Sequence, residues 1–171
     1  MKTFKVIGKQ NNSDLCFVCG VDNPIGLKSH YYVLEEYRVL GVFNGHEFLQ
    51  SFPGRMHGGI IASLLDETLG RAIQTYDESF WSVTIELNTK YIKPIPLNED
   101  LYIVGYIPNG PRKIYEGVGY ICLKDGTILA RAEGKFRMLT VSQITGQSDL
   151  NDEQWKYVDN DLKLEEVNLP E

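Results

Sequence analysis

One stretch of this 171-residue chain repeats its apolar residues with the period of an α-helix, and this stretch constrains the fold more than any other feature. From Gly59 to about Thr75, residues that can face a core recur at steps of three and four: Ile60, Ile61, Leu64, Leu65, Thr68, Ala72 and Ile73. This spacing gives the helix a wide apolar surface. A helix that is apolar over most of its circumference needs cover on several sides, so we predict one long buried helix.

The other apolar segments have the length and the β-branched and aromatic content of strands. They are residues 30–34, 37–43, 46–52, 83–94, 101–108, 114–123 and 128–139. Residues 83–88 alternate strictly, which predicts a half-buried strand with Ile85 on its apolar face and Thr84 on its polar face. Strands come before and after one helix in the sequence. This order predicts an α+β unit, in which an antiparallel sheet wraps around the buried helix.

We expect this unit to span residues 29–140, after an irregular N-terminal lead-in over residues 1–28. Residues 141–171 form an acidic tail without sustained periodicity, and we expect it to be partly disordered. From Ser148 onward the tail has eight acids and two lysines, which accounts for the whole formal net charge of −6.

The rest of the chain has as many bases as acids, so it lacks the positive field of a nucleic-acid-binding protein. Bases do exceed acids between Arg112 and Arg137. This local excess fits either a phosphate-binding site or a strand face exposed to solvent. No segment is apolar over the length of a signal peptide or a membrane span, and the three cysteines are an odd number. We therefore expect a cytoplasmic protein with reduced thiols and no membrane contact.

The helix is preceded by His57-Gly58-Gly59, a turn with two adjacent glycines. The first N–H groups of a helix lack intrahelical partners, and glycine leaves them uncovered. Together with the positive end of the helix dipole, they can bind a carbonyl or an oxyanion. The alternative is a tight turn that needs glycine only for its backbone shape.

Asp66 lies in the same helix among leucines, where a carboxylate needs a partner or a function. The alternative is that Asp66 sits on a narrow polar side and pairs with Arg71 or with solvent. Glu67 and Arg71, four residues apart, are expected to form an exposed ion pair. At about 1.5 Å per residue, Asp66 is roughly 10 Å from Gly59 along the axis, too far to act on a carbonyl held at its own helix start. A twofold dimer would instead bring Asp66 of one chain near Gly59 of the other.

These motifs resemble the hotdog-fold acyl-CoA thioesterase superfamily, and most closely its phenylacetyl-CoA-type and long-chain acyl-CoA thioesterase branch. The resemblance rests on His-Gly-Gly, five residues, then Leu-Asp, followed by the strand over residues 84–97. The segment Cys16-Phe17-Val18-Cys19-Gly20-Val21-Asp22-Asn23-Pro24-Ile25-Gly26-Leu27 also resembles a lead-in of some members. The similarity covers residues 16–139.

The resemblance implies hydrolysis of acyl-CoA thioesters to the free acid and coenzyme A. In that family the residue matching Gly59 donates its N–H to the thioester carbonyl. The neighbouring residue, which matches Gly58, also binds the substrate. The residue matching Asp66 acts as nucleophile or general base, and the hydroxyl matching Thr84 orients the water or the acid. The residue matching His57 shapes the site.

The family also implies a homodimer, possibly a dimer of dimers, with coenzyme A phosphates on bases near Lys90, Arg112 and Lys113. Neither a metal nor a cofactor is implied beyond the coenzyme A of the substrate. Many relatives have asparagine six positions before the histidine, where this chain has Ser51. That departure leaves the second positioning group open.

Two further interpretations remain. A non-catalytic acyl-CoA-binding module of the same fold would keep the binding residues without using Asp66 as a base. A structural zinc site at the Cys16-x-x-Cys19 motif would need two more ligands, sought among His30, His46, His57 and Cys122.

Overall fold

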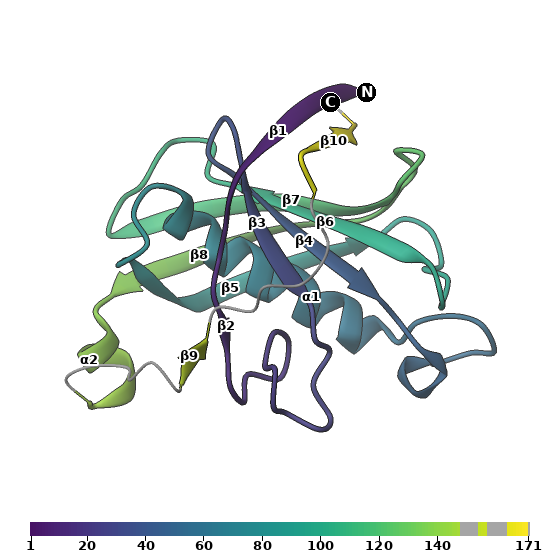
Figure 1. Ribbon diagram of the computed structural model, residues 1–171, viewed down its shortest axis with the longest axis horizontal. Helices are drawn as coiled ribbons and strands as arrows, with labels where there is room; N and C mark the ends of the chain where they lie inside the picture. Colours follow the sequence, from purple (N-terminus) through teal and green to yellow (C-terminus); the bar gives the residue numbers. More distant parts are fainter. Residues whose placement is uncertain (148–153, 157–163, 171) are drawn as a thin grey trace.

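A computed structural model describes residues 1–147, 154–156 and 164–170. An eight-stranded antiparallel sheet curves around helix α1 (Gly58–Arg71), in the strand order β10-β1-β3-β4-β6-β7-β8-β5 (Figure 1). Its strands are β1 (Lys2–Lys9), β3 (His30–Leu34), β4 (Arg38–Asn44), β5 (Trp81–Tyr91), β6 (Asp100–Tyr106), β7 (Ile114–Leu123), β8 (Ile128–Leu139) and β10 (Glu166–Leu169). A two-stranded sheet joins β2 (Asn12–Ser13) to β9 (Trp155–Lys156), and the short helices are η1 (Glu47–Leu49), η2 (Ala72–Thr75) and α2 (Val141–Thr145). The predicted α+β architecture, with one long buried helix, is confirmed.

Helix α1 is packed on two sides, as its wide apolar surface predicts. Its leucines share one core cluster with the inner face of the sheet and with Val18, Cys19 and Leu27 of the segment between β2 and β3. The helix lies close to the sheet because Gly105 has no side chain, and a Cβ there would be 3.1 Å from the carbonyl oxygen of Thr68. The helix is therefore held between the sheet and the lead-in segment, which fixes where each of its polar side chains can point.

The outer face of the sheet has a second core, which the sequence did not predict. Val167 and Leu169 of β10 and Phe4 of β1 pack with residues of β3, β4, β6 and β7 there. Strand β10 pairs with β1 in antiparallel register, from Lys2 opposite Leu169 to Lys5 opposite Glu166. The two ends of the described chain thus lie side by side and cover the far side of the sheet (Figure 1).

Two expectations about segments outside the helix are wrong. Residues 1–28 are not all irregular, because β1 extends the main sheet. Residues 46–52 form no strand but the 3₁₀ helix η1 and an isolated bridge between Gln50 and Met56. The described part of the tail contains α2 and β10, and the expected partial disorder stays untested because residues 148–153, 157–163 and 171 lie outside the described part. The expected unit of residues 29–140 leaves out β1 and β10, because these two strands pair with each other from opposite ends of the sequence.

The outer core predicts that the acidic tail contributes to stability. Leu169→Ala removes a fully buried side chain, and it should lower the free energy of unfolding by about 2 kcal/mol, the lower end for a buried leucine. Urea denaturation followed by circular dichroism measures the change. Glu166→Ala, at an exposed position of the same strand, is the matched control and should change stability by less than about 0.5 kcal/mol. Equal stability of the two variants would contradict the role of β10 in the core.

Candidate active site

Asp66 and Thr84 meet in a cavity of about 230 Å³ beside the middle of helix α1. The Thr84 hydroxyl donates a 2.8 Å hydrogen bond to Oδ1 of Asp66. Cys16, Gly70 and Ser82 also line this cavity. The alternative interpretation paired Asp66 with Arg71 or with solvent. The partner in the structure is instead a hydroxyl from the adjacent strand.

A β-bulge turns Thr84 toward Asp66. Thr84 pairs with Phe136 of β8, whereas Glu86 pairs with the next residue back, Lys135, so Ile85 is an extra residue in β5. Cross-strand partners point to the same face of a sheet, and Phe136 is fully buried in the helix-facing core. Thr84 therefore faces the helix and Ile85 is 54% exposed. The predicted alternation is wrong at this point, because the bulge shifts its phase.

Burial raises the pKa of the Asp66 carboxyl, because desolvation disfavours the charged form. The hydrogen bond from Thr84 opposes this shift, and the nearby charge of Glu67 adds to it. A carboxylate with a raised pKa binds protons more tightly than an exposed aspartate. Asp66 is thus a stronger base, held in a fixed orientation by Thr84.

The start of helix α1 forms a separate site with a cavity of about 540 Å³, lined by residues that include Ser51, Gly58 and Tyr91. His57 is the N-cap, and its Nδ1 accepts the N–H of Gly59 at 2.9 Å. The Tyr91 hydroxyl donates to the carbonyl oxygen of Gly58 at 3.0 Å. The Gly59 N–H, expected to be open, is occupied by the His57 side chain, so a bound carbonyl would have to replace this imidazole as the acceptor.

The two cavities share no lining residue. Asp66 and Thr84 line one of them, and Gly58 lines the other. Within one chain, the carboxylate and the helix start are therefore parts of different sites. This agrees with the distance along the helix axis, and a complete site with both parts would need a second chain.

Comparisons with known proteins show which family the chain resembles. Residues 53–110 match the model described as Thioesterase superfamily. A solved structure of a thioesterase superfamily protein, RHA08564, superposes with a TM-score of 0.64 at 30% identity, over 70% of this chain and 58% of that one. The chain is therefore similar to the thioesterase superfamily over residues 53–110 and in its overall fold. Its curved sheet around one helix is the hotdog fold, as the sequence motifs predicted.

Two relatives indicate what members of the superfamily can bind and do. The acyl-coenzyme A thioesterase THEM4 of Rattus norvegicus is 40% identical over 82 residues, which are 47% of this chain and 34% of that protein. The chain thus spans about a third of the length of this curated relative. A hypothetical thioesterase of Streptococcus pneumoniae TIGR4, solved with coenzyme A, has the same fold at a TM-score of 0.55 and 19% identity, over 60% of this chain and 82% of that chain.

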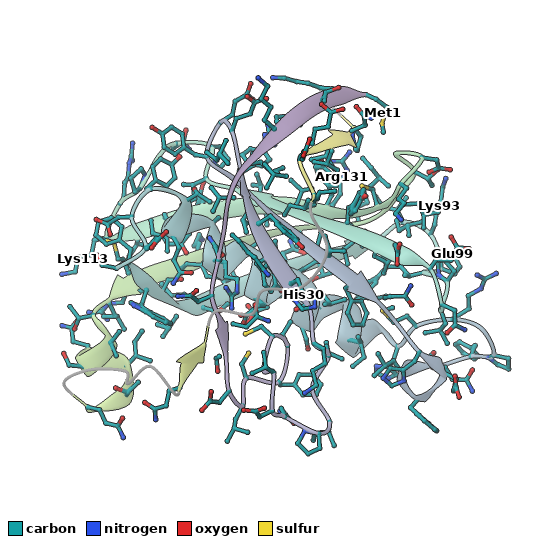
Figure 2. All side chains as sticks on the ribbon, in the orientation of Figure 1. Met1, His30, Lys93, Glu99, Lys113 and Arg131 are labelled. Carbon is teal, nitrogen blue, oxygen red and sulfur yellow. The ribbon has the colours of Figure 1, made fainter. Side chains whose placement is uncertain are left out.

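The bases expected to bind coenzyme A do not come together within one chain. Lys90 pairs with Arg131 at one end of β5, and both line a cavity of about 340 Å³ on the outer face of the sheet. Arg112 and Lys113 precede β7 near the other end of β5, since the Lys113 carbonyl accepts from Met138 of β8. Figure 2 shows Lys113 at the left edge of the molecule and Arg131 near its upper middle. In the described part of the chain, no helix has the length and apolarity to cross a membrane.

Glu67 and Arg71 form the expected ion pair, but the pair is not an exposed one. Nε of Arg71 is 2.7 Å from Oε1 of Glu67, and the Arg71 side chain is only 5% exposed. The guanidinium also donates to the carbonyl of Asn11 and lies over the ring of Tyr31. The lead-in segment covers this side of the helix, and that long-range contact could not be deduced from the four-residue spacing.

Sequence reasoning missed three residues that hold the two sites. Tyr91 contacts the helix start. The hydroxyls of Ser82 and Tyr115 lie 2.8 Å apart. Both donate to the carbonyl of Gly70, beside Asp66. Ser82 had a usable signal, because it lies two residues before Thr84 and faces the same side of the strand. Tyr91 and Tyr115 had none, since their contacts join distant parts of the chain.

The hydrogen bond from Thr84 to Asp66 has a testable consequence. Thr84→Val keeps the side-chain shape but removes the donor that favours the charged carboxylate, so the pKa of Asp66 should rise further. NMR titration of the Asp66 carboxyl carbon measures this directly. Thr89→Val, in the same strand opposite Ala132, is the control and should leave the Asp66 titration unchanged. A lower Asp66 pKa in Thr84→Val would refute the assigned role of the hydroxyl.

Proposed function

We propose that this chain hydrolyses acyl-CoA thioesters to the free acid and coenzyme A. The observation that carries the proposal is the half-buried Asp66, whose carboxyl pKa is raised by burial and whose Oδ1 is held by Thr84. Half-buried carboxylates with perturbed pKa values mark functional sites in cavities. The THEM4 similarity and the coenzyme A bound to the Streptococcus pneumoniae relative support this substrate class.

In the proposed mechanism, Asp66 acts as the general base that deprotonates water, or as the nucleophile itself. The fraction of ionised Asp66 falls as the pH drops through its raised pKa, so the rate is lost at a higher pH than an exposed aspartate would allow. The helix start polarises the thioester carbonyl and stabilises the charge that develops on its oxygen. The leaving thiolate is a weak base, with a reference thiol pKa of about 8.5, so a strong general acid is not needed. The hydrolysis requires no cofactor beyond the coenzyme A of the substrate.

We further propose that a homodimer, or a dimer of dimers, completes each site from two chains. Among the described strands, β5 pairs only with β8, so its other edge is available to a second β5. Antiparallel pairing of two β5 strands would bring the Lys90 end of one chain to the Arg112 and Lys113 end of the other. The same twofold relation would bring Asp66 of one chain toward the helix start of its partner. The bases that are apart in one chain could then bind the phosphates of one coenzyme A.

A second candidate function is a non-catalytic acyl-CoA-binding module. The observation in its favour is the occupied N–H of Gly59, which donates to His57 rather than being open to a carbonyl. The raised pKa of Asp66 favours the hydrolase, since a binding module has no need of a buried base. We propose a reducing, cytoplasmic setting for either function, because all three cysteines are free thiols.

The hydrolase proposal predicts a large effect of Asp66→Asn. The amide can still accept the Thr84 hydrogen bond but cannot deprotonate water, so kcat should fall by about 10² or more while acyl-CoA affinity persists. A thiol reagent follows coenzyme A release over an acyl-CoA panel, and calorimetry measures binding. Glu86→Gln is the matched control: it neutralises a carboxylate two residues after Thr84 on the outer face, where Glu86 contacts Lys135. Full turnover by Asp66→Asn would exclude the hydrolytic mechanism, and wild-type protein that binds acyl-CoA without turning it over would favour the binding module.

The shared-site proposal predicts that two inactive variants complement each other. Gly59→Pro removes one N–H in the first helical turn, where no intrahelical hydrogen bond is lost, and Asp66→Asn removes the base. A mixed dimer would retain one complete site, so an equimolar mixture after subunit exchange should recover about a quarter of wild-type activity. Analytical ultracentrifugation and mass spectrometry would establish the dimer and the exchange. No recovery despite confirmed exchange would show that both parts act within one chain.

A further inference from the structure

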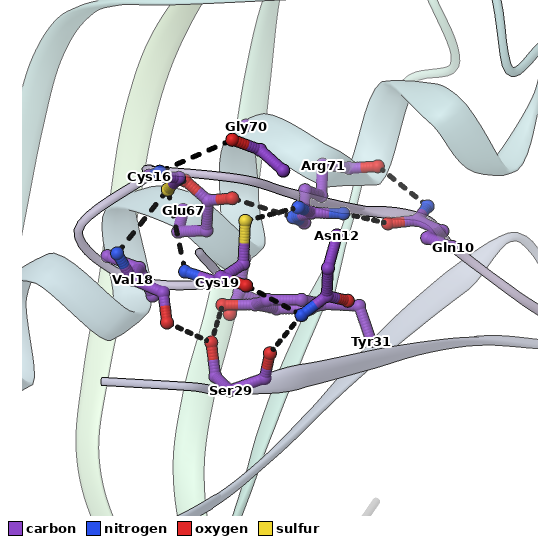
Figure 3. Close-up of polar contacts among 12 residues, drawn as sticks. Gln10, Asn12, Cys16, Val18, Cys19, Ser29, Tyr31, Glu67, Gly70 and Arg71 are labelled. Carbon is purple, nitrogen blue, oxygen red and sulfur yellow. Dashed lines mark hydrogen bonds and ion pairs between the residues drawn. The ribbon is translucent and has the colours of Figure 1, made fainter. Parts of the chain in front are cut away.

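Two thiols and a carboxylate converge on the side of helix α1 that the lead-in segment covers (Figure 3). The Sγ atoms of Cys16 and Cys19 and a carboxylate oxygen of Glu67 all lie within 4.8 Å of one another. Oε2 of Glu67 is 3.8 Å from Sγ of Cys16, while Oε1 is bound to Arg71. One oxygen of Glu67 is therefore free of the arginine and directed toward the thiols.

The Cys16-x-x-Cys19 turn has the backbone shape that prepares a thiolate ligand. Sγ of Cys16 accepts the N–H groups of Val18 at 3.4 Å and Cys19 at 3.5 Å. The turn is closed by the N–H of Gly20, which donates to the Cys16 carbonyl at 2.8 Å. A side chain at position 20 would collide with that carbonyl, so this turn requires the glycine. Hydrogen bonds to sulfur of this kind orient metal ligands and tune their charge.

Arg71 balances the charge that such a cluster would carry. Its Nη2 is 3.0 Å from Sγ of Cys19, and its Nε binds Glu67. Two thiolates and one carboxylate have three negative charges, which a divalent ion and the buried guanidinium would neutralise together. A neutral cluster avoids the large cost of an unpaired charge in the protein interior.

We propose that Cys16, Cys19 and Glu67 bind one divalent metal ion, with zinc as the ion that suits this set of donors. Zinc takes thiolate and carboxylate ligands in tetrahedral sites, and thiolates select it over magnesium and calcium. Cys16 and Glu67 line the cavity that also holds Asp66 and Thr84, so water from this cavity supplies the fourth ligand. The ion would fasten the lead-in segment to helix α1 beside the proposed catalytic carboxylate.

Glu67 distinguishes this site from a redox-active pair of cysteines. A disulfide between Cys16 and Cys19 would have no use for a carboxylate oxygen placed 3.8 Å from Sγ of Cys16. A metal ion needs this oxygen as a third ligand. Among the described residues, the histidines and Cys122 that were expected to supply the further zinc ligands do not join this cluster.

The test uses the whole chain, purified with a non-chelating reductant, and measures metal rather than hydrolysis. Mass spectrometry of the metal content should give about one zinc per chain, and Co²⁺ substitution should give thiolate-to-cobalt charge-transfer absorption. Cys16→Ser and Cys19→Ser should each weaken zinc affinity by more than about 100-fold, and Glu67→Gln by at least about tenfold. Cys122→Ser is the matched control, because Cys122 is a buried thiol in the outer core and should leave binding unchanged.

Three results would overturn the proposal. One is a reduced wild-type protein that folds, by circular dichroism, and neither retains nor takes up zinc. Another is equal zinc affinity in wild type and the Cys16→Ser/Cys19→Ser double variant. The third is a mass loss of two hydrogens on mild oxidation, with no metal bound before it, which would identify a disulfide pair. None of these outcomes depends on thioester hydrolysis, so failure of the metal site and failure of the hydrolase proposal are separate results.

Discussion

The burial of helix α1 on two opposite sides is the constraint on which the rest of the structure depends. The sheet covers one side and the lead-in segment covers another, and residues from both share a core with the helix. Polar side chains on such a helix cannot simply turn to water, and each needs a partner. Asp66 takes the Thr84 hydroxyl, while Glu67 and Arg71 take each other and atoms of the lead-in segment.

Two neighbouring acids on the helix consequently have different chemical environments. Successive helical residues point about 100° apart, so Asp66 and Glu67 face different neighbours. Asp66 meets a neutral hydroxyl, and burial raises the pKa of its carboxyl. Glu67 is next to a buried guanidinium and two thiols. One acid is thus suited to proton transfer, and the other to an ionic or metal-bound role.

The parts of the proposed site lie in separate regions of one chain. The helix start and the carboxylate lie in separate cavities, and the bases expected to bind phosphate lie at opposite ends of β5. Strand β5 lies at the edge of the sheet, and its Ile85 is exposed between these two ends. In the proposed homodimer, a twofold partner along β5 would join these separate parts.

The sequence by itself determined the helix, most of the central strands and the motif that carries the chemistry, because these follow from local periodicity and from residues close together in the chain. It also placed Asp66, Thr84 and the His57-Gly58-Gly59 turn in one family pattern. Only the tertiary structure decided the partners. The Ile85 bulge that turns Thr84 inward, the His57 cap on Gly59, and the pairing of β1 with β10 depend on contacts between distant segments. The burial of Arg71 has the same origin: a spacing of four residues predicts an ion pair, but whether water or another segment covers it is set by the packing of the whole chain.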